Sequence, residues 1–186
     1  MITIVTEPEE EPITLTEAKA HLRVDVDADD TLITSQIKAA RMHCEAFTRR
    51  AFVTQTLDLA LDAWAAGNLE LWRPPLQSVT SVTYTDADGN ATVLDAANYE
   101  VDTYDGRIRF TSLPAATLRH MSGVVIRYVA GYGDAEDVPE IIKQAILLTI
   151  GDLYLFRESS ITQAVNEIPL SAQMLLWPVR SWRRHK

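Results

Sequence analysis

Several features that mark common protein classes are missing from this sequence of 186 residues. It has one cysteine, Cys44, so no disulfide can form within the chain, which is compatible with a reducing compartment. It has no apolar run of about 20 residues, the length that a helix needs to cross a bilayer. Its first residues are not a basic segment followed by an apolar one, so we expect no secretory signal.

Motifs that carry catalysis or hold cofactors are also missing. The sequence has no phosphate-binding GxxxxGK[ST] run and no GxSxG motif. None of its four histidines has a second histidine four residues away, and Cys44 has no cysteine companion for a metal. On a helix, His43 and Cys44 would point about 100° apart, so they cannot act together as base and nucleophile. We therefore predict no catalytic residues, no metal site and no cofactor.

One aspartate-rich stretch, Asp25 to Asp30, resembles part of a calcium-binding loop. It lacks the glycine that follows the first ligands and the glutamate that closes such a loop. We interpret it as a solvated turn that caps the following helix, with a weakly bound cation as the alternative.

Positive charge is scarce and unevenly placed. The formal net charge is −9, which argues against a protein that grips DNA by neutralising phosphates but not against one that DNA slides past. Residues 1–30 are rich in Asp and Glu, whereas residues 169–186 contain three arginines, one lysine and no acid. We expect the two ends to meet different partners. The segment Glu7 to Glu11 is interpreted as a solvated, disordered arm, or, in a ring around DNA, as a surface that repels phosphate.

Helix signals occur near both ends of the chain. Thr14 and Glu17 match a capping box, which predicts a short helix to about Arg23. A second helix is predicted by apolar residues three and four apart, with Lys38, Arg41 and Glu45 on its other faces. The apolar positions are Ile33, Ile37, Ala40, Cys44 and Phe47.

A third helix begins near Pro139 and is apolar around almost its whole circumference. Such a helix is buried on more than one side, so we expect a neighbouring subunit to cover part of it. The predicted subunit-interface residues are Ile142, Ile146, Ile150 and Tyr154. Residues 157–167 are polar, and we expect a mobile loop there.

Between the helices, short alternating segments separated by turn residues predict six or seven strands from about Val53 to Ala130. Asp88-Gly89 and Asp105-Gly106 are tight-turn signals, and Gly131 and Gly133 are interpreted as a strand exit. The predicted fold class is α+β: a small helical bundle formed by the N- and C-terminal helices, with an inserted antiparallel β module. The parts are residues 1–52 (arm and helices), 53–133 (β module) and 134–186 (helices and docking tail).

The end of the chain combines two tryptophans, a proline and three arginines within ten residues. Trp and Arg are enriched at interface hot spots, so one interpretation is an anchor that binds a partner. A helix packed on its own core and a nucleic-acid contact are the other two interpretations. The predicted partner-binding residues are Leu175, Leu176, Trp177, Pro178, Val179, Arg180, Trp182 and Arg183.

Several segments together resemble the phage head–tail connector (adaptor) family, in the group with a β insert that is found in tailed phages and in gene transfer agents. The similar segments are Leu15 to Asp25, Ile37 to Arg50, Tyr99 to Asp102, Asp105 to Ile108, Gly131 to Gly133, Val138 to Glu140, Lys143 to Ile146, and Tyr154 with Arg157 and Glu158. They span most of the chain, and it is their order and spacing that make the resemblance specific.

The resemblance implies a structural, non-enzymatic subunit of a ring of about twelve copies in the neck of a virion or virus-like particle, assembled in the host cytoplasm. By the same resemblance, the ring binds the portal through the C-terminal segment, bridges to a downstream tail component and surrounds a channel through which DNA passes without specific binding. We expect removal of the chain from Leu170 onward to leave a folded monomer that cannot bind the portal. A nucleic-acid-binding protein and a small hydrolase with carboxylates on the β module are the alternatives; salt-sensitive DNA binding would favour the first, and a pocket with converging carboxylates the second.

Overall fold

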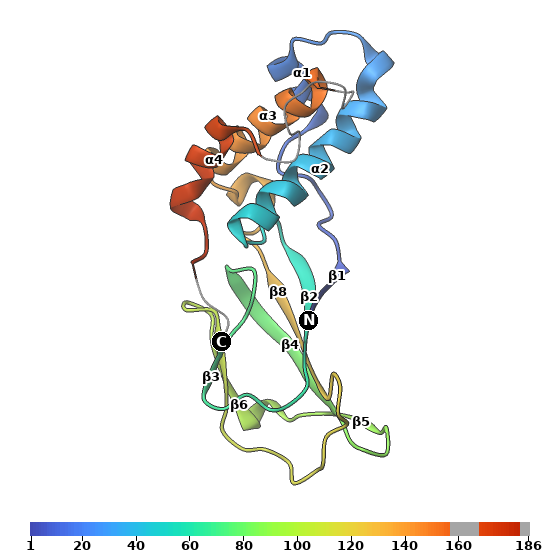
Figure 1. Ribbon diagram of the computed structural model, residues 1–186, viewed down its shortest axis with the longest axis vertical. Coiled ribbons are helices and arrows are strands. Elements are labelled where there is room, and N and C mark those ends of the chain that lie inside the picture. Colours follow the sequence, from blue (N-terminus) through green and yellow to red (C-terminus); the bar gives the residue numbers. More distant parts are fainter. Residues whose placement is uncertain (157–167, 183–186) are drawn as a thin grey trace. The chain divides into compact units, whose positions relative to one another are not determined.

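The computed structural model describes residues 1–156 and 168–182, which fall into two compact units (Figure 1). The helical unit comprises Glu9–Val53 and Gly133–Trp182. The β unit comprises Met1–Pro8 and Thr54–Tyr132, and residues 183–186 lie outside the described ranges. The α+β class is confirmed. The predicted loop at residues 157–167 also lies outside the described residues. No helix in the described ranges is long and apolar enough to cross a membrane.

The helical unit contains helices from both ends of the sequence. They are α1 (Leu15–Leu22), α2 (Asp30–Thr48), α3 (Glu140–Leu155) and α4 (Leu170–Leu176), with short 3-10 turns η1 (Asp27–Asp29), η3 (Ala135–Asp137) and η4 (Trp177–Val179). The predicted capping box is confirmed: Thr14 Oγ1 accepts from the Glu17 amide at 3.2 Å, and the Glu17 carboxylate accepts from the Thr14 amide at 2.7 Å. This reciprocal pair satisfies amide groups that would otherwise lack partners at the start of α1.

Packing of α2 against α3, and of α3 against α4, forms the core of the helical unit. The predicted stripe on α2 is buried except for Phe47, which is half-buried. Its partners on α3 and α4 are also fully buried: Ile142, Ala145, Ile146, Ile150, Ala172 and Leu176. The chain therefore covers most of the apolar circumference of α3 with its own helices.

The core also encloses Cys44, whose thiol lies 3.7 Å from the Thr149 hydroxyl. Burial, more than any other factor, raises the pKa of the Cys44 thiol to about 11. Because the thiolate is the reactive form, we expect native protein at pH 8 to resist Ellman's reagent, with complete reaction after unfolding in guanidinium chloride. Measuring the released thionitrobenzoate checks this. Stoichiometric reaction within seconds in the native state would show that the thiol is accessible.

The prediction that Arg41 and Glu45 face away from the core is wrong, because both side chains are buried. Arg41 Nη1 donates to Glu45 Oε2 at 3.0 Å, and Arg41 Nε donates to Glu11 Oε2 at 2.7 Å. The other Glu45 oxygen accepts from the Phe52 amide at 2.9 Å. Burial is tolerated because each charge has an opposite charge and further hydrogen bonds.

The acidic segment near the start of the chain is likewise not the solvated, disordered arm that we expected. Glu11 forms the ion pair with Arg41, and the Glu10 carboxylate accepts from the Ala135 amide at 2.7 Å. These contacts fix the segment to α2 and to the start of η3. Residues before it form a strand, β1 (Ile2–Thr6), which was not predicted.

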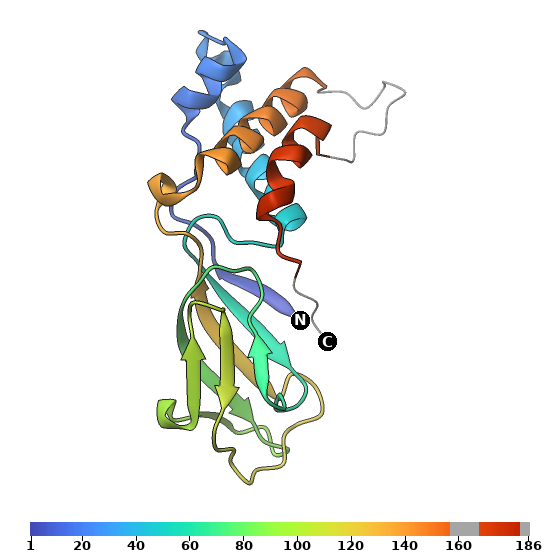
Figure 2. The same ribbon diagram turned by 90° about the vertical axis from the view of Figure 1, so that its left-hand side faces the viewer.

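The β unit has two antiparallel sheets, one with strand order β1-β2-β8-β4-β5 and one with order β3-β7-β6. The strands predicted within the insert are all present: β2 (Gln55–Leu61), β3 (Asn68–Glu70), β4 (Leu76–Thr85), β5 (Ala91–Val93), β6 (Tyr99–Asp102), β7 (Arg107–Phe110) and β8 (Val124–Ala130). Figure 2 shows the smaller sheet lying over one face of the larger one. Trp64 joins them, with ring centroids 5.7 Å from Tyr84 and 5.1 Å from Phe110.

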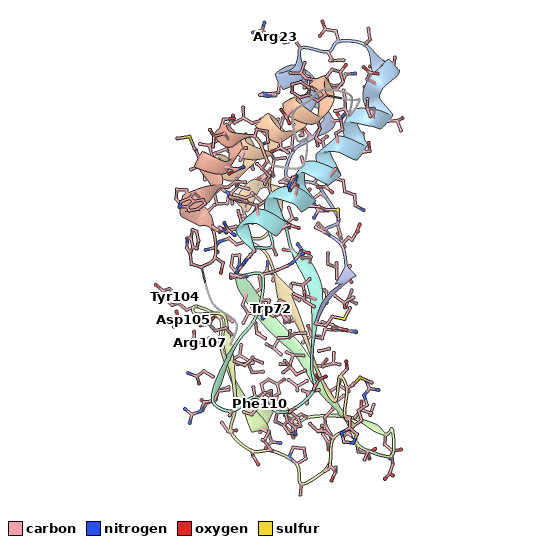
Figure 3. All side chains as sticks on the ribbon, in the orientation of Figure 1. Arg23, Trp72, Tyr104, Asp105, Arg107 and Phe110 are labelled. Atoms are coloured by element: carbon pink, nitrogen blue, oxygen red, sulfur yellow. The ribbon has the colours of Figure 1, made fainter. Side chains whose placement is uncertain are left out.

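Turn residues occupy the positions that their chemistry predicts. Gly106 has φ 62° in the turn between β6 and β7, where Tyr104 extends into solvent beside Asp105 and Arg107 (Figure 3). Gly133 has φ 142°, and a Cβ there would collide with the Asp137 carboxylate. Only glycine fits this position without strain, which agrees with the structural interpretation of the Gly131–Gly133 segment.

Candidate docking surface

The C-terminal segment of the helical unit is held against the end of α2. After η4, the Ser181 amide donates to the Thr48 carbonyl at 2.8 Å. Arg50 Nε donates to the Val179 carbonyl from the other direction. These two hydrogen bonds fix the backbone on both sides of Arg180, so the side chains that follow η4 have a defined position rather than that of a free tail.

Aromatic rings and one guanidinium group form a cluster at this point. The Arg180 guanidinium carbon lies 4.9 Å from the Phe47 ring centroid, 4.9 Å from that of Trp182 and 5.7 Å from that of Trp177. The two indoles meet edge to face at 4.9 Å. Cation–π contacts of this kind favour the charged side chain over the ring faces. Even so, Trp177 is 53% exposed and Trp182 57% exposed.

Helix α4 extends the exposed apolar area. Leu170, Met174 and Trp177 lie at i, i+4 and i+7, on one face of the helix, and all three are exposed. The opposite face is buried through Ala172 and Leu176. We call the exposed side chains of Leu170, Met174, Trp177 and Trp182, together with the half-buried Arg180, the docking surface. Sequence reasoning missed Leu170 and Met174, although their helical spacing from Trp177 was the signal that could have found them.

The predicted partner-binding residues divide between this surface and the core. Trp177, Pro178 and Trp182 are exposed, whereas Leu175, Val179 and Arg180 are half-buried. Leu176 is fully buried and packs inside its own unit, so it cannot contact a partner directly. Arg183 lies outside the described residues.

The predicted subunit-interface residues of α3 lie within the helical unit. Ile142, Ile146 and Ile150 are fully buried by the chain's own helices, and the Tyr154 hydroxyl donates to Asp29 at 2.6 Å. The apolar circumference therefore does not require a neighbouring subunit, which removes the physical reason for choosing those isoleucines. On α3 and at its end, the exposed large apolar side chains are instead Ile141, Leu155 and Phe156.

Charge around the docking surface is one-sided. Ile168 to Trp182 contains no Asp or Glu, and Arg49 and Arg50 lie at the adjacent end of α2.

The acidic turn before α2 is partly neutralised within the chain, because Lys19 pairs with Asp27 and Asp30 at 2.7 Å each. Among the described residues, no group of three or more potential metal ligands comes together there or elsewhere.

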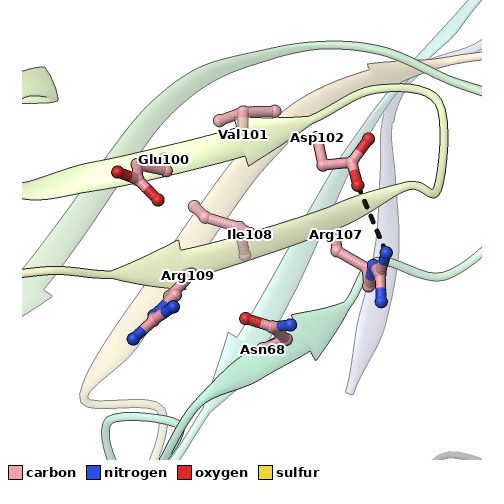
Figure 4. Close-up of a pocket in the computed structure, with 7 residues that line it drawn as sticks. All are labelled: Asn68, Glu100, Val101, Asp102, Arg107, Ile108 and Arg109. Atoms are coloured by element: carbon pink, nitrogen blue, oxygen red, sulfur yellow. Dashed lines mark hydrogen bonds and ion pairs between the residues drawn. The ribbon is translucent and has the colours of Figure 1, made fainter.

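A polar hollow of about 310 Å³ lies on the face of the smaller sheet, between β3, β6 and β7 (Figure 4). Its carboxylates do not converge: Glu100 is in register with Arg109, and Asp102 with Arg107. The Asp105 amide, and secondarily Arg107, hold the pKa of Asp102 below its usual value. Two carboxylates that each face an arginine do not form the acid–base pair that the hydrolase hypothesis needs.

Comparison with known proteins agrees with this arrangement. Residues 11–166 match the family model described as head completion protein. Among solved structures, one from the neck of an empty gene transfer agent particle, computed with C6 symmetry, has a TM-score of 0.82 and 27% identity over 99% of this chain and 97% of its own. Another, from the virion of a native gene transfer agent particle, has a TM-score of 0.78 and 26% identity over the same shares of the two chains.

A third solved chain, from the neck of a native particle computed with C12 symmetry, has a TM-score of 0.73 and 26% identity, again over 99% and 97% of the two chains. No match is found among curated proteins. The resemblance drawn from the sequence is confirmed, and the alternative functions gain no support. The chain belongs to the head completion protein family, as a structural component of the head–tail connection.

Proposed function

We propose that this chain is the ring-forming subunit of a neck, and that it docks on the portal through the docking surface. The ring, of about twelve copies, bridges from the portal to a downstream tail component and surrounds a channel through which DNA passes without specific binding. Support for the ring comes from the similar chains, which lie in particle necks computed with sixfold and twelvefold symmetry. The net charge of −9 suits a channel wall that does not hold DNA.

The observation that carries portal docking is the pair of half-exposed tryptophans on a fixed backbone. Burial of a large aromatic side chain lowers the free energy of the complex, and such side chains dominate the hot spots of interfaces. Here the stacking with Arg180 orders both rings before any partner binds. The two rings would therefore lose little side-chain entropy when a partner binds them, which strengthens association.

Two interpretations of the C-terminal segment are combined in this proposal. Packing on its own core is the role of one face of α4, through Ala172 and Leu176. Docking on another chain is the role of the opposite face. Removal of the chain from Leu170 onward would therefore expose apolar side chains of α3 that α4 covers. We no longer expect the truncated chain to fold normally, so point variants test the docking instead.

The test is a pair of binding titrations, one against purified portal and one against duplex DNA, each at about 50 and 200 mM salt. Portal docking through mainly apolar contacts predicts saturable portal binding that changes little between the two salt concentrations. It also predicts no measurable DNA binding at either concentration. DNA binding that falls steeply with salt, without portal binding, would instead establish the nucleic-acid alternative.

A further inference from the structure

The larger sheet of the β unit has two open edges. Strand β1 pairs only with β2, and β5 pairs only with β4, among the residues that the structure describes. Each open edge presents backbone N–H and C=O groups that another strand could pair with. Soluble proteins usually protect such edges with charged residues or proline. In a chain with 23% charged residues, β1 and β5 contain neither. Their remaining protection is geometric, because β5 is three residues long and the register of β1 shifts between Ile4 and Thr6.

The hydrogen bonds identify which backbone groups are open. Met1 and Ala60 exchange two hydrogen bonds, at 2.9 and 2.8 Å, so pairs alternate from there along β1. Thr3 therefore pairs inward with Asp58, and the N–H and C=O groups of Ile2 and Ile4 point to the open edge.

On β5 the backbone groups alternate in the same way. The Leu94 amide donates to the Val82 carbonyl, and the Asp86 amide to the Asn90 carbonyl. By alternation, the open groups are those of Ala91 and Val93. Each edge thus has two residues, at positions i and i+2, whose backbone N–H and C=O groups are open for pairing.

Strand direction makes the two edges compatible with each other. All four neighbouring pairs in the larger sheet are antiparallel, so its first and fifth strands run in the same direction. A head-to-tail contact around a rotation axis keeps strand direction, and so it can place β5 of one copy beside β1 of the next. A contact between two β1 strands would be antiparallel and two-fold, and it would stop at a dimer.

Exposed apolar side chains occur at both edges. Val93 is 65% exposed on β5, and Val5 is 43% exposed on β1. Side chains on neighbouring strands pack when they share a face, which adds to the backbone hydrogen bonds. Contact between two such uncharged edges would bury the exposed valine side chains and pair backbone groups without burying a charge.

We propose that β5 of one copy pairs in parallel with β1 of the next copy, so that the larger sheets continue from subunit to subunit around the ring. The occupant of each edge is a second copy of this chain. This inference rests on the proposed ring, and it adds a specific contact between subunits that portal docking does not require.

Cysteine cross-linking tests the contact in the full chain mixed with its portal. Thr3→Cys and Val93→Cys place thiols at the two edges, and native Cys44 does not interfere because it is fully buried. Parallel neighbours bring Cα atoms within the range that a disulfide spans. The double variant should form a ladder of covalent multimers under mild oxidation, whereas each single variant should remain monomeric. Val5→Cys in place of Thr3→Cys covers a shifted register.

A second variant pair tests the hydrogen bonds themselves. Val93→Pro removes an N–H that points to the open edge and leaves the pairing of β5 with β4, whereas Val93→Thr keeps that N–H. We expect Val93→Pro to raise the concentration for half-maximal ring assembly on the portal by about tenfold and Val93→Thr to change it little. Normal assembly of Val93→Pro, with both double-cysteine variants monomeric, overturns the edge contact alone. Absence of rings from the unmodified chain overturns the proposed function as well.

Discussion

Replacing both Trp177 and Trp182 with alanine should weaken binding to the portal by about 1,000-fold, since each buried hot-spot tryptophan contributes about 2 kcal/mol or more and about 1.4 kcal/mol corresponds to a tenfold change. Both rings are about half exposed in the free chain, at 53% and 57%, so about half of their area is available to a partner. The same exposure means that the fold depends little on them. Biolayer interferometry against immobilised portal measures the binding, and circular dichroism measures the melting temperature.

The matched control for this double variant is Tyr104→Ala. Tyr104 is another exposed aromatic residue, in the turn between β6 and β7 of the β unit, and it is not on the docking surface (Figure 3). The control should bind the portal as the unmodified chain does. If the double variant binds within about threefold of the unmodified chain while folding normally, the tryptophans do not carry the docking.

The second large effect concerns stability. Glu45→Ala should lower the free energy of unfolding of the helical unit by about 3–5 kcal/mol, because it leaves the Arg41 charge buried with less compensation. It also leaves the Phe52 amide without the acceptor that it has 2.9 Å away. Urea unfolding followed by far-ultraviolet circular dichroism measures this change as a lower midpoint of the helical transition.

Two further variants separate the causes of that loss. His43→Ala alters an exposed residue on the same helix. It should change the free energy of unfolding by no more than about 0.5 kcal/mol, the usual range of surface substitutions. Glu45→Gln can still accept from the Phe52 amide but loses the charge, so it should fall between Ala and the native residue. A Glu45→Ala midpoint equal to that of His43→Ala would mean that the buried ion pair is dispensable.

Local signals in the sequence were enough for most of the helices and strands but not for the network inside the helical unit. The capping box at Thr14, the stripe on α2 and the strands from β2 to β8 follow from short-range chemistry and periodicity. Arg41 and Glu45 look like surface residues by type. Their burial depends on Glu11, which lies 30 residues away from Arg41, and no local pattern predicts an ion pair over that separation.

Strand β1 was missed for a similar reason. It is five residues long and precedes an acidic segment, and its partner β2 begins more than 50 residues later. The C-terminal segment was recognised by its composition, yet composition does not say which face of α4 is buried. Only the packing of Ala172 and Leu176 separates the core face from the face that carries Leu170 and Met174.

The proposed portal docking and the proposed edge pairing would assign separate tasks to the two units. The helical unit would supply the aromatic anchor, and the β unit would supply backbone pairing between copies. If the tasks are separate, the variant with both tryptophans replaced should lose portal binding but keep the ability of its β5 to pair with β1 of another copy. Val93→Pro should show the opposite, with single subunits still binding the portal and fewer closed rings.

Electron cryomicroscopy of the unmodified chain mixed with its portal can show directly whether the docking surface contacts the portal. We expect a closed ring of about twelve copies seated on the portal, with density for Trp177 and Trp182 against portal side chains. A ring that contacts the portal elsewhere while both tryptophans face solvent would rule out docking through these residues. A portal that stays bare at saturating concentration would rule out docking altogether.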